Sequence, residues 1–163
     1  MSDRQFGAVV VTVSDSASRG TRDDLSGPAA ARLLEESGIG VLQRLIIPDE
    51  LERIKTTLVE QCDREDVDLV VTSGGTGFSP HDVTPEATLA VIERQANSLA
   101  ELMRARASGD DPRSALSRGI AGIRAETLIV NLPGSPSAVE ESLKILIPIL
   151  NHALLLIGGG EPH

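Results

Sequence analysis

The feature that constrains this chain most is a loop with three glycines in four positions, Gly74 to Gly77. An apolar run, Leu69 to Val71, precedes the loop and an amphipathic run, Ala87 to Ile92, follows it, which predicts a strand, a sharp turn and a helix start. Glycine permits sharp bends and the close approach of other groups. Exposed amide N–H groups beside a helix N-terminus bind anions such as phosphate. Because Asp82 lies in the same loop, we expect a metal ion to bridge its carboxylate and a bound anion.

Strands and helices are predicted to alternate along the whole chain. Runs of aliphatic and β-branched residues predict strands over 8–13, 41–47, 68–72 and 127–131. Helical periodicity predicts helices over 26–38 (with Ser26 as the N-cap), 50–63, 84–94, 98–107 and 137–156. Residues 114–118 fit a short helical turn, and residues 119–124 fit either an edge strand or a loop. The pattern indicates a single α/β domain over residues 1–163, a three-layer sandwich of a mostly parallel β-sheet with helices on both faces.

The end of the chain carries two further signals. Pro148 lies inside the last predicted helix and predicts a kink there. Three glycines follow the helix, so residues 158–163 are predicted to form a flexible C-terminal tail.

Four polar loops follow the predicted strands. They span 14–26, 48–50, 73–85 and 131–136, and each carries glycine, proline or small polar residues. Ligands in open parallel sheets bind outside the carboxyl ends of the strands. We therefore expect these four loops to converge on one site.

Composition excludes several classes of protein. The chain has two Phe, no Trp and no Tyr, and its formal net charge is −9, so neither stacking platforms nor a basic surface for nucleic acid is expected. The single cysteine, Cys62, cannot form an internal disulfide, and the first residues lack the features of a signal peptide. No apolar run approaches the ~20 residues of a membrane span. We expect a cytoplasmic protein without a membrane or nucleic-acid partner.

Common catalytic motifs are also missing from the loops. Pro80 stands where a dinucleotide-binding fingerprint requires its third glycine, and no phosphate-binding loop with a Gly-Lys-Ser/Thr ending occurs. The three histidines are scattered without zinc-ligand spacing, and no Gly-x-Ser-x-Gly nucleophile elbow is present. What remains is an anion cradle with two carboxylates at strand ends, Asp49 and Asp82, which suits Mg²⁺ and nucleotide phosphates.

Each of these residues also has a plain structural explanation. Asp49 could be the N-cap of the following helix, and Asp82 could cap a helix or close a turn. Ser117 and Arg118 could be an ordinary cap and a solvated charge. Residues 132–136 could be a rigid connector instead of a ligand loop, and His81 could be a solvated turn residue.

Several blocks in order resemble the molybdopterin adenylyltransferase family (MogA/MoaB-like proteins and the gephyrin G domain). The most specific block, residues 72–88, reads TSGGTGFSPHDVTPEAT. The others are TVSD (12–15), DLSG (24–27), IPDE (47–50), ALSR (115–118) and NLPGSP (131–136). The resemblance covers nearly the whole chain, from residue 8 to about residue 157. One departure stands out, because the family commonly has Arg before the second aspartate, where this chain has His81.

The resemblance implies an ATP- and Mg²⁺-dependent adenylylation of molybdopterin that releases pyrophosphate and supplies a downstream metal-insertion enzyme. It places the family's two functional aspartates, catalytic and Mg²⁺-binding, on Asp49 and Asp82. It also implies the α/β fold and a homotrimer. The nucleotide- and pterin-binding residues expected on this basis are Ser14, Asp15, Ser73, Gly74, Gly75, Thr76, Gly77, Ser117, Arg118, Asn131, Pro133, Gly134 and Ser135. The alternative is a non-catalytic molybdopterin-binding or assembly protein of the same family.

Overall fold

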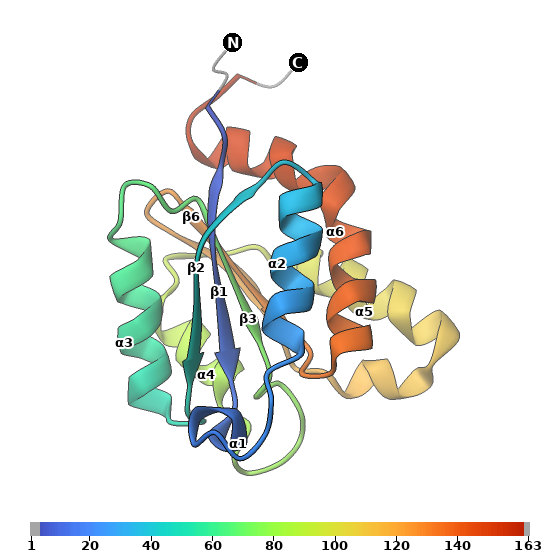
Figure 1. Cartoon of the computed structure of the whole chain (residues 1–163). Coiled ribbons are helices and arrows are strands. Elements are labelled where there is room, and N and C mark those ends of the chain that lie inside the picture. Colours follow the sequence, from blue (N-terminus) through green and yellow to red (C-terminus); the bar gives the residue numbers. More distant parts are fainter. Residues whose placement is uncertain (1–3, 162–163) are drawn as a thin grey trace.

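The computed structural model describes residues 4–161, which form six strands and six α-helices that mostly alternate (Figure 1); the helix Asp15–Ser18 and the strand Arg94–Gln95 were not predicted. The elements are β1 (Gly7–Val13), α1 (Asp15–Ser18), α2 (Ser26–Glu36), β2 (Gly40–Ile47), α3 (Leu51–Cys62), β3 (Leu69–Ser73), α4 (Thr84–Val91), β4 (Arg94–Gln95), α5 (Asn97–Asp110), the 3-10 helix η1 (Pro112–Leu116), β5 (Ala121–Arg124), β6 (Thr127–Leu132) and α6 (Pro136–Ile157).

One mixed sheet organises the fold, with strand order β2-β1-β3-β6-β5-β4. The four strands β2, β1, β3 and β6 run parallel, while β5 and β4 are antiparallel to their neighbours. Residues 119–124, which the sequence left open, therefore contain a strand. The predicted mostly parallel sheet is confirmed.

Alternating side chains of β1 divide the core into two layers. Val10 points into a cluster with residues of α2, α5 and α6, whereas Val9 and Val11 point into a cluster with residues of α3 and α4. All three valines are fully buried, and each such side chain contributes roughly 1.5–3 kcal/mol to folding. Figure 1 shows these two helix groups on opposite faces of the sheet, so the three-layer sandwich is confirmed.

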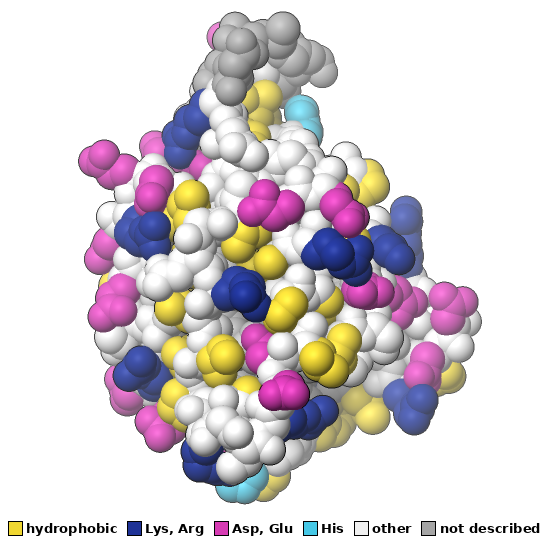
Figure 2. Space-filling view, in the orientation of Figure 1, with side chains coloured by type: hydrophobic (Ala, Val, Ile, Leu, Met, Phe, Trp, Pro, Cys, Tyr) yellow, Lys and Arg dark blue, Asp and Glu magenta, His cyan; other side chains and the backbone are white. Residues whose placement is uncertain are grey.

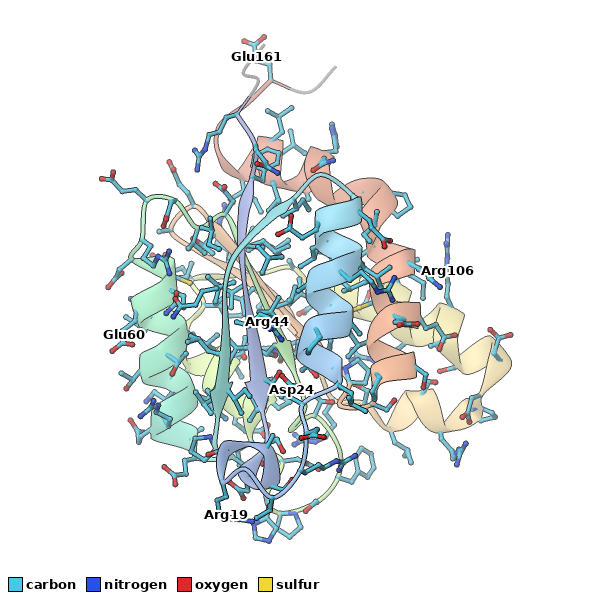
Figure 3. The ribbon with its side chains drawn as sticks, viewed as in Figure 1. Arg19, Asp24, Arg44, Glu60, Arg106 and Glu161 are labelled. Atoms are coloured by element: carbon cyan, nitrogen blue, oxygen red, sulfur yellow. The ribbon has the colours of Figure 1, made fainter. Side chains whose placement is uncertain are left out.

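Strand β2 differs from β1 because it lies at the edge of the sheet. Leu45 and Ile47 pack with the α3 and α4 core, whereas Leu42 and Ile46 are 46% and 45% exposed. Arg44 (Figure 3) alternates with Leu45 along the strand and so lies on the same face as Ile46. The sequence predicted the strand, and the structure adds that it is an edge strand with exposed apolar side chains.

Three predicted helix boundaries are corrected. Ser26 is not the N-cap of α2: its hydroxyl donates to the Gly134 carbonyl at 2.6 Å, while the Asp24 carboxylate accepts from the Gly27 amide at 3.0 Å. Helix α4 ends at Val91 and not at residue 94, because Arg94 and Gln95 form the short strand β4. Helix α5 continues past its predicted end to Asp110, because one glycine is tolerated in a helix and the break comes at Pro112.

Helix α6 contains Pro148, and its ribbon changes direction along its length (Figure 1), as predicted for a proline that cannot donate to the preceding turn. The amides of Gly158, Gly159 and Gly160 donate to carbonyls of the last turn. These three glycines therefore close the helix instead of fraying from it, and residues 162–163 of the predicted tail lie outside the described part.

The surface agrees with the acidic composition. Lys and Arg side chains are interspersed with Asp and Glu over the face shown in Figure 2, without a continuous basic area on that face. Within residues 4–161, no helix is long and apolar enough to cross a membrane.

Candidate active site

The predicted loops converge at the carboxyl ends of the parallel strands. After β1 the chain passes to β2 on one side, and after β3 it passes toward β6 on the other, so the strand order reverses between β1 and β3. Crevices at such reversals are the usual ligand sites of open α/β sheets. Figure 3 shows Asp24, from the loop after β1, at this edge of the sheet beside the start of α2.

Two carboxylates, those of Asp49 and Asp82, lie close to the backbone of the glycine loop, residues 74–77. Gly74 and Gly75 have φ angles of +99° and +69°, which side-chain-bearing residues rarely adopt. A Cβ on Gly75 would contact the Thr84 hydroxyl and would lie 3.1 Å from Asp49 Oδ1. A Cβ on Gly77 would lie 2.8 Å from Asp82 Oδ2. The glycines are therefore needed for the approach of the aspartates as well as for the turn.

Consecutive backbone amides of this loop are available to a ligand. The N–H groups of Gly75, Thr76, Gly77 and Phe78 donate to no acceptor among the described residues. Gly74 differs from the prediction, because its amide donates to the Leu132 carbonyl at 3.2 Å. Successive unpaired amides in a turn form an anion-binding concavity, so the cradle begins at Gly75.

Asp49 is held by Asp15 across the ends of β1 and β2. The Asp15 amide donates to Asp49 Oδ2 at 3.0 Å, and the Asp49 amide donates to Asp15 Oδ1 at 2.9 Å. The N-cap of α3 is Glu50, and no side chain caps that helix. The interpretation of Asp49 as an N-cap is therefore wrong, and its Oδ1 has no hydrogen bond from the part of the chain described.

Burial raises the pKa of Asp49 above the ordinary aspartate value of 3.8. The negative charges of Asp15 and Asp82 raise this pKa further, while the hydrogen bond from the Asp15 amide and the charge of His81 lower it. A carboxylate that is desolvated next to other carboxylates favours a cation. The structure thus brings Asp15, Asp49 and Asp82 into electrostatic range of one another.

Asp82 closes the turn that follows the glycine loop. Its Oδ2 accepts from the Ser79 amide at 3.0 Å, and it does not cap α4, whose N-cap is Val83. The turn-closing interpretation of Asp82 is confirmed, but it engages one oxygen. As for Asp49, the other oxygen has no hydrogen bond from residues 4–161.

Arg118 holds the glycine loop in place. Its Nε donates to the Gly77 carbonyl and its Nη2 to the Asp82 carbonyl, both at 2.8 Å. The same guanidinium forms two hydrogen bonds to the Glu86 carboxylate, at 2.8 and 3.1 Å, and the Arg118 amide donates to the Thr76 carbonyl at 2.7 Å. The interpretation of Arg118 as a solvated charge is therefore wrong. Its donors are engaged by the loop, so its part in the site is to position Asp82 and the free amides.

Asn131 and Ser117 support the wall behind this loop. The side-chain Nδ2 of Asn131 donates to the hydroxyls of Thr72 and Thr88 at 3.0 Å, and its Oδ1 accepts from the backbone amide of Ile120 at 3.1 Å. Asn131 is buried together with both threonines, so its geometry is that of a brace between β3, β6 and α4. The Ser117 carbonyl accepts from Arg104 at 3.4 Å. A role for either side chain in contacting a ligand stays a prediction.

The loop after β6 lies against the glycine loop. Gly134 is close to Gly74, and Ser135 caps α6 by accepting from the Ala138 amide at 3.2 Å. On the other side, Ser14 caps the short helix α1 by accepting from the Ala17 amide at 3.2 Å. The loop of residues 132–136 is therefore a helix start that also lines the site.

Ser73 carries an unsatisfied group at the end of β3. Its residue is 1% exposed, and its hydroxyl is the buried side-chain polar atom without a hydrogen-bond partner in the described structure. Buried polar groups nearly always have partners. An orphaned hydroxyl next to the glycine loop therefore points to a ligand at this place.

Two cavities adjoin the glycine loop. The larger, of about 490 Å³, lies between the loop, α5, η1 and the start of α6, and we call it the α5–α6 pocket. The smaller, of about 310 Å³, lies between the loops after β1, β3 and β6 and includes Ser14, Ser73 and Ser135. All the predicted site residues except Asp15, Asp49 and Arg118 line one of these cavities.

Sequence reasoning missed three residues of this region. Thr84 donates its hydroxyl to the Gly74 carbonyl at 3.0 Å, Arg104 donates to the Gly119 carbonyl at 2.6 Å, and Asp24 accepts from Thr12 at 2.9 Å. Thr84 and Asp24 lie in recognised blocks, which was a usable signal. Arg104 lies on a helix with ordinary polar residues around it, and nothing in the sequence distinguishes it.

Comparison with known proteins agrees with the geometry. Residues 9–152 match a family described as a probable molybdopterin binding domain. A molybdopterin adenylyltransferase of Helicobacter pylori is 41% identical over 152 residues, covering 92% of this chain and 86% of that protein. The molybdenum cofactor synthesis protein cinnamon of Drosophila melanogaster is 39% identical over 91% of this chain, which corresponds to 25% of its own length.

Solved structures show the same fold. The molybdopterin biosynthesis enzyme MoaB of Thermus thermophilus has a TM-score of 0.90 and 45% identity, with 97% of this chain and 99% of that chain covered. The molybdopterin biosynthesis Mog protein of Mycobacterium ulcerans has a TM-score of 0.87 and 39% identity, with 93% and 99% covered. The chain therefore belongs to the molybdopterin adenylyltransferase family, within the wider group described as probable molybdopterin binding domains.

Proposed function

We propose that this protein adenylylates molybdopterin in molybdenum cofactor biosynthesis, using ATP and releasing pyrophosphate. The observation that carries the proposal is the meeting of the free amides of Gly75–Phe78 with the unshared oxygens of Asp49 and Asp82. An anion cradle next to carboxylates suits a nucleotide with its metal ion. The family membership supplies the substrate, because relatives at about 40% identity are named molybdopterin adenylyltransferases.

The reaction needs positioning more than a protein nucleophile. An oxygen of the terminal phosphate of molybdopterin attacks the α-phosphorus of ATP, and the bond from that phosphorus to the bridging oxygen breaks as pyrophosphate leaves. Phosphoryl-type transfers depend on orientation and charge neutralisation. The amides of Gly75–Phe78 would donate to phosphate oxygens, and Arg118 would keep these amides in place through the Gly77 carbonyl.

The donor set fits Mg²⁺. This ion prefers oxygen ligands and is often held by one or two carboxylates, with waters and substrate phosphates completing its shell. Asp49 and Asp82 would hold it through their free oxygens, and no cluster of three potential His, Cys, Asp or Glu ligands occurs within residues 4–161. When bound, Mg²⁺ would neutralise phosphate charge and orient ATP.

The wider setting of the proposal comes from the family resemblance. The protein would act in the cytoplasm as a homotrimer and pass adenylylated molybdopterin to a metal-insertion enzyme. The single buried Cys62 supports a reducing compartment.

A pyrophosphate-release assay tests the function. Purified protein with molybdopterin and ATP should release pyrophosphate when Mg²⁺ is added, should stop when the metal is chelated, and should recover when Mg²⁺ is restored. Molybdopterin binding without any pyrophosphate release, with fresh substrate and active metal, would instead assign the protein to the non-catalytic binding role.

A further inference from the structure

The α5–α6 pocket has the size and lining of a site for a planar ring. Its volume of about 490 Å³ lies within the range of small-molecule sites. One turn after another of α5 contributes Ala100, Met103 and Ala107 to one wall, and Ala138 contributes to the facing wall on α6. Small and flexible apolar side chains on both walls leave a slot for an aromatic ring system.

One charged side chain of this pocket remains without a partner. Five charged residues line it: Asp82, Arg104, Asp111, Arg113 and Glu141. Asp82 belongs to the metal site proposed above, Arg104 donates to backbone carbonyls, and Asp111 pairs with Arg113 at 2.9 Å. Glu141 is half-buried and forms no hydrogen bond or ion pair with residues 4–161. Its neighbour Ser142 is 4% exposed and lines the same pocket.

We propose that Glu141 determines specificity by accepting two hydrogen bonds from the amino-oxo edge of a pterin bound in the α5–α6 pocket. The inference rests on the proposed function, which supplies a pterin as substrate. A pterin presents a ring N–H next to an exocyclic amino group, and these two donors match the two acceptor oxygens of a carboxylate. The pairing has the forked geometry that makes carboxylate recognition strong and specific.

The same carboxylate disfavours adenine at this position. The corresponding edge of adenine offers an amino donor next to a ring nitrogen that accepts, so one carboxylate oxygen would face a lone pair. A site that accepts hydrogen bonds from ligand donors rejects a ligand that lacks them, because its acceptor stays unpaired. Because of Glu141, the α5–α6 pocket would bind the pterin ring in preference to the adenine of ATP.

Binding of 6-hydroxymethylpterin, followed by the fluorescence of the pterin, tests this assignment without requiring turnover. Glu141→Gln keeps the size of the side chain but places an NH₂ donor opposite a pterin donor. We expect it to weaken pterin binding about 10- to 100-fold, the effect of losing a charged hydrogen-bonded pair. Glu140→Gln is the matched control, since Glu140 pairs with Arg32 at 2.9 Å outside the pocket; its effect should be less than about twofold.

Turnover separates the two substrates. Glu141→Gln should raise KM for molybdopterin by a similar factor and leave KM for ATP unchanged, and Glu141→Asp, which keeps the charge, should recover part of the pterin affinity. Thermal unfolding of each variant checks that the fold is intact. Unchanged pterin binding in Glu141→Gln, or a loss of adenosine binding in its place, would overturn the inference.

The outcome is distinguishable from failure of the proposed function. If wild-type protein adenylylates molybdopterin but Glu141→Gln binds pterin normally, the role of Glu141 is wrong and the function stands. If no pyrophosphate is released but pterin binding depends on Glu141, the specificity inference stands and the function is wrong.

Discussion

Asp49 and Asp82 flank one glycine loop but are held in opposite ways. Asp49 is fixed by backbone hydrogen bonds exchanged with Asp15, and burial beside other carboxylates raises its pKa. Asp82 lies in a turn, where its own carboxylate and the guanidinium of Arg118 fix the backbone around it. One aspartate is placed by the sheet and the other by a loop that a single arginine holds. Two aspartates with the same proposed chemical role can therefore differ in how much each destabilises the folded protein.

Neutralising each aspartate should separate activity from stability. Asp49→Asn and Asp82→Asn are each expected to reduce pyrophosphate release about 100- to 1,000-fold, the usual effect of removing one electrostatic contact at a reacting phosphate. Asp49→Asn should also raise the unfolding free energy, because it removes a charge that burial disfavours, although solvent around the half-buried carboxylate screens part of this effect. Asp82→Asn should change stability by less than about 0.5 kcal/mol. Full turnover in either variant, or equal stabilisation of both in urea unfolding, would break the comparison.

Adding one methyl group to the glycine loop tests the close approach itself. Gly75→Ala is expected to cost about 3 kcal/mol, since alanine is strained at a positive φ and its Cβ would contact Thr84 and Asp49. Gly20→Ala is the matched control: its φ is +74° but no atom lies within 4 Å of the added Cβ. It should cost about 1 kcal/mol from backbone strain alone. Equal costs for the two, measured by urea unfolding, would show that the loop has room for the methyl group.

Replacing Arg118, which holds the loop that carries Asp82, tests how much the position of Asp82 depends on this arginine. Arg118→Ala should lower stability by about 1–2 kcal/mol and reduce turnover, because the Gly77 and Asp82 carbonyls lose a donor. Arg118→Lys should restore little, since one ammonium cannot reach both carbonyls and Glu86 with the geometry of a guanidinium.

Arg32→Ala serves as the control for the loss of a positive charge. Arg32 pairs with Glu36 and Glu140 on the surface, and its removal should cost less than about 1 kcal/mol. If Arg32→Ala reduced turnover as much as Arg118→Ala, the reduction would come from net charge and not from the loop.

The smallest expected effect is a difference in pH dependence. Because the pKa of Asp49 is raised in the folded chain, the folded state binds a proton more tightly than the unfolded state between 3.8 and the raised value. Between these two pH values the free energy of unfolding falls as pH rises. Above the raised pKa, Asp49 is fully charged in the folded protein and the destabilisation is complete. The stability difference between wild type and Asp49→Asn should therefore shrink as pH falls from about 7 to about 4. A difference that stayed constant in urea unfolding across this range would contradict the raised pKa.

Local signals in the sequence were sufficient for most of the fold. The fully buried strand β1 is an unbroken β-branched run, and the glycine loop marks the end of β3 without ambiguity. The exposure of Leu42 and Ile46 in β2 could not be predicted, because both resemble core residues in the sequence. Whether a strand lies at an edge depends on strand order, which no local pattern encodes.

The site was predictable in its residues but not in their partners. Asp49 had two interpretations, and the choice depended on an amide 34 positions earlier in the chain, at Asp15. Arg118 contacts the Gly77 carbonyl from 41 positions away. A motif can indicate that such residues matter, but the atoms that they contact follow from the packing of strands distant in sequence.

The Ser73 hydroxyl, which has no hydrogen-bond partner among residues 4–161, should make the melting temperature of the protein depend on whether the site holds a ligand. A buried hydroxyl without a partner costs about 1–3 kcal/mol, and the ligand-free protein bears that cost continuously. A ligand that supplies an acceptor at this point would remove it, so binding would raise the melting temperature by more than the ligand's other contacts explain. Ser73→Ala should show the reverse: a ligand-free protein that melts at a higher temperature and responds less to the ligand.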